Sequence, residues 1–447
     1  MNSGPVRALL REVTDFTAHR ETLSQVRYPV GAMLISQTVL GFGVVAVLSR
    51  LLGAEAFGEY AVILTVASVF QLIAAFPVES GIPKFLAEAN QQSRSEVKAY
   101  YAAGLLTRLA ASLLALLAAA ALARQLSGLY HIPRLTGAVL FASLYLCLLV
   151  PVYSYYMACI QGMERPRRWA TANVLISLLI FPLALIGALG FSRWGQGGLM
   201  VLLAAGWLLA AAVAAFLARG ALGFLWSVAD WSRLRLLVMF LLPMWVVPLF
   251  GFIARTVVRS WLAVKWGPVP LGQLEIGLTL LAHLGTVYQA SMIVLLPAWT
   301  RRYARQEGAA LLQSYSMARG LLIGVAVVYG ATLVFAGQWI VPAIFGREQI
   351  GAVPTARIIG LIMPIMIAGW VASGTNVICN CTAIIGKANL IWFLLVVALG
   401  LVLIPPLGAV GAALAWLGAY CVYSWFNISR ARPFFREVES WPRSSAP

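Results

Sequence analysis

The sequence predicts an all-α polytopic membrane protein with about twelve transmembrane helices, arranged as two six-helix lobes around a central cavity. Three observations support this fold class. Hydrophobic residues make up 61% of the 447 residues and charged residues only 11%, which is more apolar surface than a water-soluble fold can bury. Long apolar runs follow one another along the chain, and glycine spacings found in the first half return in the second.

The expected spans follow from the lengths of the apolar runs. A transmembrane helix needs ~20 mostly apolar residues to cross ~30 Å of hydrocarbon. Twelve runs meet this length, at 29–50, 60–81, 100–123, 135–161, 168–191, 197–218, 236–263, 270–298, 314–335, 354–380, 388–405 and 407–428. Pro405 and Pro406 separate the last two runs, which could otherwise be mistaken for one long helix.

The distribution of Lys and Arg predicts the orientation. The chain carries 32 Lys and Arg against 15 Asp and Glu, a formal net charge of +17. In a polytopic protein this excess is explained by basic cytoplasmic loops, so we expect no nucleic-acid partner. With both termini cytoplasmic, 21 of these cations fall in inside segments and 7 in outside segments. We therefore expect a multi-pass protein of the inner (cytoplasmic) membrane with both termini inside.

The segments between the spans leave no room for a separate catalytic domain. The stretch 82–98 mixes apolar and charged positions and is expected to form an amphipathic helix at the cytoplasmic interface. The longest outside loop, 336–353, holds an apolar stretch suited to lying on the membrane surface. The five cysteines lie in apolar runs and the three histidines lack metal-ligand spacing, so neither a metal nor a cofactor is expected. No removable signal peptide is expected either.

Two glycine pairs indicate an internal duplication. Gly53 and Gly58 precede the second span, and Gly267 and Gly272 have the same spacing before the eighth. The pair at 195 and 198 likewise matches the pair at 408 and 411, at nearly the same offset. Because each repeat holds six spans, the two copies have the same orientation in the membrane. We expect a cytoplasmic segment 1–28, a first lobe 29–229, a second lobe 230–429 and a cytoplasmic tail 430–447.

Several motifs resemble those of the polysaccharide-biosynthesis flippases. They are LSRLLGAEAFGEY at 48–60, FPVESGIPKFLAEA at 76–89, CIQGMERPRRW at 159–169, IFGREQIGAVPTARIIG at 344–360 and IGKANLIWFLLVVALGLVLIPPLGAVGAALAW from 385. The resemblance covers nearly the whole chain and is to the O-antigen (Wzx-type) flippase family. That family belongs to the multidrug/oligosaccharidyl-lipid/polysaccharide (MOP) exporter superfamily, together with multidrug extruders and lipid II flippases.

The resemblance implies a MATE-like fold and a transporter rather than an enzyme. The implied cargo is a polyprenyl-pyrophosphate-linked oligosaccharide, moved by alternating access from the cytoplasmic to the periplasmic leaflet for cell-surface polysaccharide biosynthesis. The implied partners are this cargo, membrane lipids, and polysaccharide polymerase or assembly proteins. The sequence departs from the family at Arg255, since many relatives carry an acidic residue near this position of span seven. No coupling site is therefore carried over from the family.

Three arginines inside spans are candidates for binding the pyrophosphate. A cation at membrane depth is costly and usually faces a cavity or a partner. Arg255 and Arg259 are four residues apart on one face of span seven, and guanidinium forks match phosphate oxygens. The alternative is that both extend to the periplasmic interface. Arg108 in span three is the third candidate, or else a structural residue inside its lobe.

The remaining candidates concern charge balance and gating. Glu275, early in span eight, is expected to neutralise Arg255 and Arg259 or to bind a coupling ion. His283 in the same span is a candidate proton carrier, although a hydrogen-bonded His inside a bundle is commoner. A cytoplasmic gate is expected from the side chains listed next, each of which could instead be an ordinary interfacial residue. They are Glu79, Lys84 and Arg319.

Two other classes compete with a flippase. A membrane glycosyltransferase or polymerase acting on lipid-linked sugars would need a large outside loop with catalytic acids or His, which this chain lacks. A multidrug or cation extruder would need carboxylates at depth, where this chain places more arginines than acids. Pro243 and Pro248 interrupt span seven, so this charged helix is also expected to bend.

Overall fold

The computed structural model describes residues 30–163, 165–222, 230–379 and 381–441, and nearly all of them are helical. After a helical start at 30–36, the elements are η1 (Gln37–Gly43), α3 (Val44–Ala74), α4 (Val78–Gln92), α5 (Arg94–Leu129), η2 (Pro133–Leu135), α6 (Thr136–Leu144), η3 (Tyr145–Leu149), α7 (Val150–Gly162), α8 (Pro166–Leu189), α9 (Phe191–Leu222), α10 (Trp231–Trp266), α11 (Pro268–Ala304), α12 (Gly308–Phe345), η4 (Arg347–Ala352), α13 (Val353–Ile378) and α14 (Thr382–Glu439). The predicted segment 1–28 and the predicted lobe boundary at 229 lie outside the described residues.

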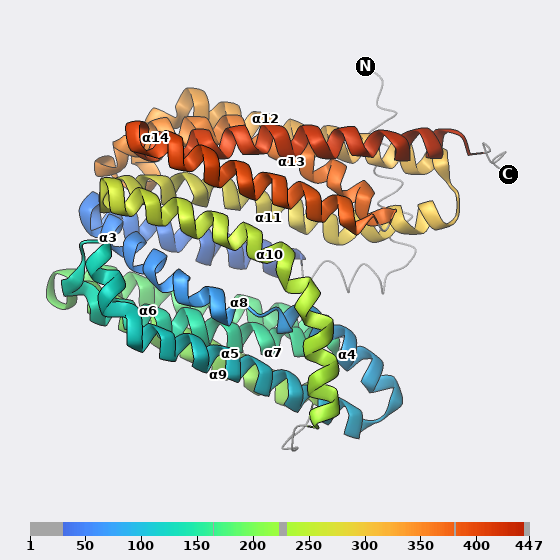
Figure 1. Cartoon of the computed structure of the whole chain (residues 1–447), viewed down its shortest axis with the longest axis horizontal. Helices are drawn as coiled ribbons and strands as arrows, with labels where there is room; N and C mark the ends of the chain where they lie inside the picture. Colours follow the sequence, from blue (N-terminus) through green and yellow to red (C-terminus); the bar gives the residue numbers. More distant parts are fainter. Residues whose placement is uncertain (1–29, 164, 223–229, 380, 442–447) are drawn as a thin grey trace.

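The membrane character predicted from the sequence is confirmed. Ten helical stretches of the described chain are long and apolar enough to cross a membrane. Three of them, 30–92, 191–219 and 383–439, are each interrupted by a glycine with non-helical backbone angles, at Gly53, Gly195 and Gly408. In Figure 1 the chain doubles back within α14, so that its two parts lie side by side. The number of twelve spans stays a prediction.

The glycine pairs of the predicted repeat share backbone conformations. Gly53 has a φ of 79° and Gly267 a φ of 80°, while Gly195 and Gly408 have φ values of 56° and 58°. Positive φ is costly for residues with a Cβ and open to glycine. Matching positions of the two halves therefore reverse the chain in the same way, as a duplication requires.

The second glycine of each copy packs against its counterpart. A Cβ added to Gly272 would lie 3.2 Å from the Gly58 Cα, and a Cβ on Gly58 would collide with the Pro268 carbonyl. Residues related by a two-fold axis can touch each other only near that axis. The first turns after the two chain reversals, in α3 and α11, therefore meet near the axis that relates the halves.

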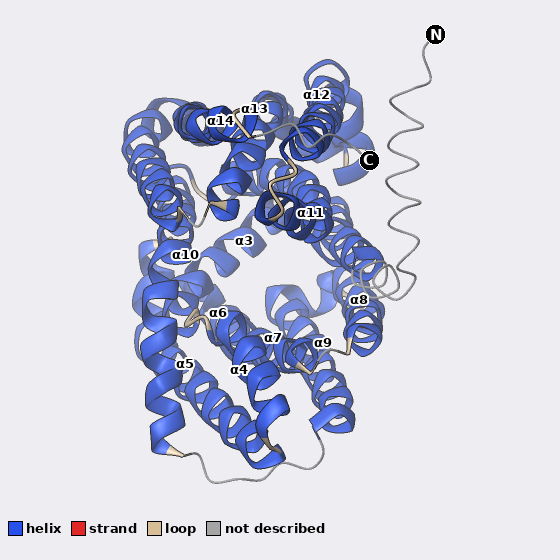
Figure 2. Ribbon diagram, turned by 90° about the vertical axis from the view of Figure 1, so that its right-hand side faces the viewer, coloured by secondary structure: helices blue, strands red, loops and turns tan. Residues whose placement is uncertain are grey.

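Helices of the two halves occupy different sides of the molecule. In Figure 1, α11 to α14 lie above α4 to α9, and Figure 2 shows the same separation in a view roughly along the helix axes. The end of the molecule that carries η4 and Gly58 is called the η4 end, and the opposite end, with α4, the α4 end. Figure 1 also shows α10 bent, with its first part crossing towards α4. The bend agrees with Pro243 and Pro248 in this helix.

The structure corrects two expectations about connecting segments. The amphipathic helix expected over 82–98 is α4, which starts earlier and ends at Gln92, because Ser93 caps the next helix by accepting from the Glu96 N–H. The outside loop expected over 336–353 is largely helical, since α12 continues to Phe345 and η4 follows. Phe345 is fully buried there rather than lying on a surface.

Candidate functional site

A cavity of about 220 Å³ lies between the first helical segment and the helices of the second half. It is lined by residues of η1, α10, α11, α13 and α14, and they include Arg255, Arg259, Glu275 and His283. Four residues selected from the sequence thus share one cavity. Spans one, seven and eight line it together with α13 and α14, and the part of α3 that covers span two contributes no lining residue in the described chain.

Arg255 is the available cation of this cavity. Its side chain is accessible, yet protein surrounds it on most sides, as fits a group that faces an internal space. No carboxylate forms an ion pair with it among the described residues. An arginine keeps its charge at any physiological pH. The cavity therefore presents a guanidinium whose donors are open to an anion.

Arg259, one turn further along α10, is paired instead. Its Nε lies 2.5 Å from Glu275 Oε1, and its Nη2 donates to Glu275 Oε2 at 2.8 Å. The two side chains are 26% and 21% exposed, so the pair stands at the cavity wall rather than in the core. This is the charge pairing expected for Glu275. Together with Arg255 it leaves a net charge of one positive unit on these three groups.

His283 faces the same cavity from α11. Its ring lies 5.4 Å from that of Phe42, and its Nδ1 is buried without a hydrogen-bond partner among the described residues. The expected hydrogen-bonded His is thus not observed at Nδ1. Phe42 belongs to η1, a π-helical segment, and such irregular turns are frequent at functional sites.

The sequence analysis missed the aromatic side of the cavity. Trp370 of α13 and Trp416 and Tyr420 of α14 line it, and Gln37 of η1 adds an amide. The only sequence signal for the two tryptophans was their position inside spans ten and twelve, away from the ends where indoles anchor a helix at the interface.

Arg108 does not line the cavity, so the structure does not bring it together with Arg255 and Arg259. It is 0% exposed. Its Nη1 donates to Ala74 O at 2.5 Å, and its Nη2 donates to Phe76 O at 2.6 Å and to Glu79. Ala74 is the last residue of α3, Phe76 follows it before α4 begins, and Glu79 lies in the first turn of α4. Arg108 therefore holds the break between two helices together, with a cation at one helix end and an anion at the other.

The expected gate of Glu79, Lys84 and Arg319 does not form. Glu79 pairs with Arg108, while Lys84 approaches Glu88 at 3.9 Å and lies 4.8 Å from the centre of the Phe240 ring. Arg319 is exposed on α12, and no ion pair joins it to either partner in the described part of the chain. Glu79 and Lys84 are five residues apart in α4, about 1.4 turns, so the two side chains leave the helix on different sides, and Glu79 faces Arg108.

A polysaccharide biosynthesis protein family model matches residues 30–301, more than half of the chain. The chain belongs to this family. No curated protein matches the chain as a close relative.

Solved structures place this family member among the MOP-superfamily folds. An inward-facing multidrug resistance MATE-family transporter of the MOP superfamily superposes with a TM-score of 0.74 and 13% identity, covering 92% of this chain and 96% of that one. The lipid II flippase MurJ, in an inward closed conformation, superposes with a TM-score of 0.73 and 11% identity, covering 91% of this chain and 88% of that one. A MOP-superfamily transporter from Pyrococcus furiosus, described as having a binding pocket of reverse polarity, superposes with a TM-score of 0.54 and 13% identity. The match covers 93% of this chain and 96% of that one. The predicted all-helical membrane fold and the predicted polysaccharide-biosynthesis family are confirmed.

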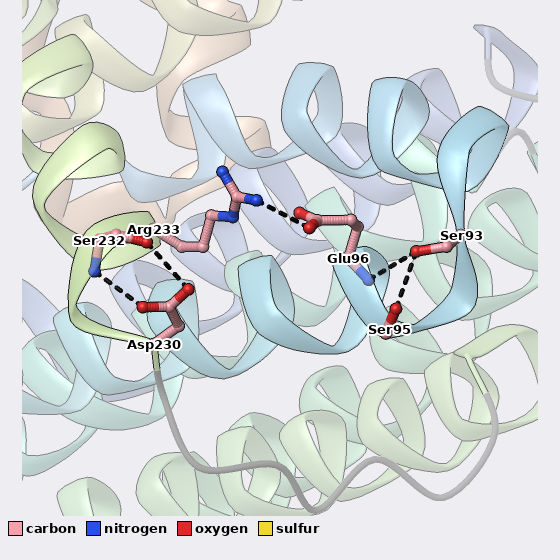
Figure 3. Close-up of polar contacts among 6 residues, drawn as sticks. All are labelled: Ser93, Ser95, Glu96, Asp230, Ser232 and Arg233. Atoms are coloured by element: carbon pink, nitrogen blue, oxygen red, sulfur yellow. Dashed lines mark hydrogen bonds and ion pairs between the residues drawn. The ribbon is translucent and has the colours of Figure 1, made fainter.

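In this family member the contact between halves at the α4 end rests on side chains. Arg233 of α10 donates to Glu96 of α5 at 2.7 Å, as Figure 3 shows. Asp230 begins α10 by accepting from the Ser232 N–H at 2.9 Å, and this bond holds the pKa of Asp230 below its ordinary value. Sequence reasoning missed this pair, because two polar residues in separate interfacial segments carry no signal of contact.

Proposed function

We propose that the protein is a flippase for a polyprenyl-pyrophosphate-linked oligosaccharide, working by alternating access. The observation that carries the proposal is Arg255, an accessible guanidinium in the cavity that forms no ion pair with a carboxylate of the described residues. Burying an unpaired charge is unfavourable unless a partner arrives. A pyrophosphate supplies several oxygens that a guanidinium fork can bind together.

The neighbouring groups favour an anion over a cation. Arg259 stands one helical turn from Arg255 and is already neutralised by Glu275 at 2.5 Å. The pair reduces repulsion between the two arginines and leaves Arg255 as the main binding group. A cation extruder would need the opposite balance, with carboxylates exceeding arginines in the cavity. We therefore favour a flippase over a multidrug or cation extruder.

The proposed direction of transport agrees with the membrane potential. A pyrophosphate cargo carries roughly two negative charges, and an inside-negative potential favours the outward movement of each by ~2.3 kcal/mol per 100 mV. The potential itself can then drive export, with Glu275 setting the charge around the arginines. The ion-coupled alternative makes Glu275 the group that receives a proton or Na⁺.

Flipping by purified protein in liposomes tests the proposal. We expect transport of a short-chain polyprenyl-pyrophosphate-linked oligosaccharide, loss of transport in Arg255→Ala, and partial retention in Arg255→Lys. Arg124→Ala, an exposed arginine of α5, serves as the matched control. Equal, wild-type transport by both Arg255 variants would refute the pyrophosphate role.

The driving force is tested in the same liposomes. We expect an imposed K⁺-diffusion potential to change the rate without any pH or Na⁺ gradient. If transport follows only an ion gradient, and Glu275→Gln abolishes that dependence, the ion-coupled alternative is correct.

A further inference from the structure

A second hollow lies between the two halves at the η4 end. It is a groove of about 710 Å³ between the first part of α3, the last turns of α12 and η4. Its lining includes three exposed side chains, Arg50 of α3, Trp339 of α12 and Arg347 of η4. No residue lines both this groove and the cavity described above. The groove is therefore a separate place in the fold, with a volume within the ~300–1,000 Å³ usual for ligand sites.

Both halves build the groove, and glycines allow their close approach. Gly53 has a φ of 79°, and a Cβ added to it would lie 2.5 Å from Glu348 Oε2. A Cβ on Gly346 would come within 3.2 Å of the Arg50 Cα. Arg50 Nη1 donates to the Ala343 carbonyl at 2.6 Å, so this side chain reaches from the first half to the second. The groove therefore depends on the contact between the halves at this end.

The groove carries an excess of positive charge. Arg347 forms no ion pair with an acidic residue of the described chain. Arg50 donates to one carbonyl, and a guanidinium has five N–H donors. The acid that lines the groove, Glu348, accepts from the Ala54 N–H at 3.2 Å. Two guanidinium groups against one carboxylate leave a net charge of one positive unit, which favours an anionic ligand.

An apolar face of α12 continues from the groove. Val328, Phe335 and Trp339 are 68%, 76% and 65% exposed, and their spacing places them on one face of the helix. Figure 2 shows α12 at the periphery of the bundle, so in a membrane this face meets acyl chains. The rise from Val328 to Trp339 is ~16 Å at ~1.5 Å per residue, about half of the ~30 Å hydrocarbon core. Trp339 then lies at the interface, where indoles are enriched, and Arg347 lies beyond it on the headgroup side.

We infer that the groove binds the headgroup of an anionic phospholipid, with one acyl chain lying along α12. The phosphodiester lies between Arg50 and Arg347, since guanidinium groups bind phosphate oxygens and basic pockets beside transmembrane helices bind anionic head groups. Because the two arginines belong to different halves, the bound phosphate stabilises the contact between the halves at the η4 end. This lipid is a partner of the protein and not its cargo, so the inference goes beyond the proposed function.

Photo-crosslinking of the purified full-length protein in nanodiscs of unlabelled phosphatidylcholine tests the inference. The probes are trace amounts of phosphatidylglycerol and of phosphatidylcholine that carry the same diazirine in one acyl chain. Peptide mass spectrometry compares the yield on α12 at 328–339 with the yield on α5 at 113–122, where Leu113 and Leu117 are 59% and 60% exposed. One net positive charge near the surface corresponds to about a fivefold preference. We therefore expect phosphatidylglycerol to label α12 about fivefold more than phosphatidylcholine does, and both probes to label α5 alike.

Charge variants at the groove should move this preference in opposite directions. Arg347→Gln should abolish it, because the net charge of the groove falls to zero. Glu348→Gln keeps an acceptor for the Ala54 N–H and removes a negative charge, so it should raise the preference about a further fivefold. Arg124→Gln, the matched change on an exposed arginine of α5, should leave it unchanged. Arg255→Ala should also leave it unchanged, whether or not this variant transports cargo, which separates the groove from the cavity.

Three results would overturn the inference. The first is equal labelling of α12 by both probes in the wild type, and the second is a preference that persists in Arg347→Gln. The third is loss of the preference when glycerophosphoglycerol, the headgroup without acyl chains, is added at the concentration of the labelled lipid, because the groove then takes a free phosphodiester. Exchange of all phosphatidylcholine for phosphatidylglycerol should raise the melting temperature of the wild type more than that of Arg347→Gln. Equal shifts would show that the bound lipid does not stabilise the contact between the halves.

Discussion

Two arginine–glutamate pairs lie within the helical bundle, and they differ in how many partners each arginine has. Arg108 is fully buried and donates to two backbone carbonyls and to Glu79. Arg259 pairs with Glu275 at the wall of a cavity, one turn from Arg255, which has no carboxylate partner in the described chain.

The difference separates structural from functional arginines. A buried charge held by protein acceptors stabilises the fold, and both Nη atoms of Arg108 have such acceptors, while its Nε lacks one among the described residues. A charge in a cavity that no carboxylate neutralises destabilises the empty protein and gains a partner on binding. Burial in the membrane alone therefore does not identify a binding residue, whereas a position in a cavity without an ion-pair partner indicates one.

The largest expected effect comes from Arg108→Leu. The substitution leaves Glu79 and the Ala74 and Phe76 carbonyls without their partner at the α3–α4 break, which should destabilise the protein by ~3–5 kcal/mol. We expect little folded protein, measured as monodisperse yield in detergent. Arg124→Leu, on an exposed site of the same helix, should purify like the wild type. A normal yield and melting temperature for Arg108→Leu would show that Arg108 does not stabilise the fold.

Arg255→Ala should show the opposite behaviour. Its melting temperature without ligand should equal or slightly exceed that of the wild type, because an unpaired charge has been removed. Farnesyl pyrophosphate at 100 times its Kd should stabilise the wild type by ~2.7 kcal/mol and should barely stabilise the variant. A large loss of stability in the unliganded variant would make Arg255 structural, like Arg108.

Glu275→Gln sharpens the comparison by turning a paired arginine into a free one. The loss of the ion pair should cost ~1–2 kcal/mol, less than a fully buried pair because both side chains are partly exposed. The more positive cavity should bind farnesyl pyrophosphate several-fold more tightly. Glu96→Gln, outside the cavity, should leave that affinity unchanged. Weaker binding by Glu275→Gln would show that Glu275 positions Arg259 for the ligand.

The smallest expected effect belongs to Arg233 and Glu96 at the α4 end. These side chains are 35% and 26% exposed, and exposed pairs contribute ~0.2–1 kcal/mol. A double-mutant cycle with Arg233→Ala and Glu96→Ala should give a coupling energy in this range that falls as salt is added. A salt-independent coupling of several kcal/mol would show that this contact stabilises the protein as much as the buried pair of Arg108 and Glu79.

The two ends of the molecule were not equally predictable. The glycine spacings at 53 and 267 anticipated two matching chain reversals, because a positive φ is a local property that glycine alone tolerates readily. The contact of α10 with α5 was not anticipated, since it joins residues that lie far apart in the chain and in segments of ordinary composition.

By itself the sequence determined the all-helical membrane fold, the matching chain reversals at the paired glycines and the shared face of Arg255 and Arg259. Hydropathy, glycine spacing and helical periodicity are properties of single segments, so they can be read without knowing how the segments pack. Only the tertiary structure decided that Arg108 is buried outside the cavity, that Glu79 pairs with it rather than with Lys84, and that α13 and α14 supply the aromatic side of the cavity. These features depend on the rotation of each helix about its axis and on partners far away in the chain, and packing of the whole bundle sets both.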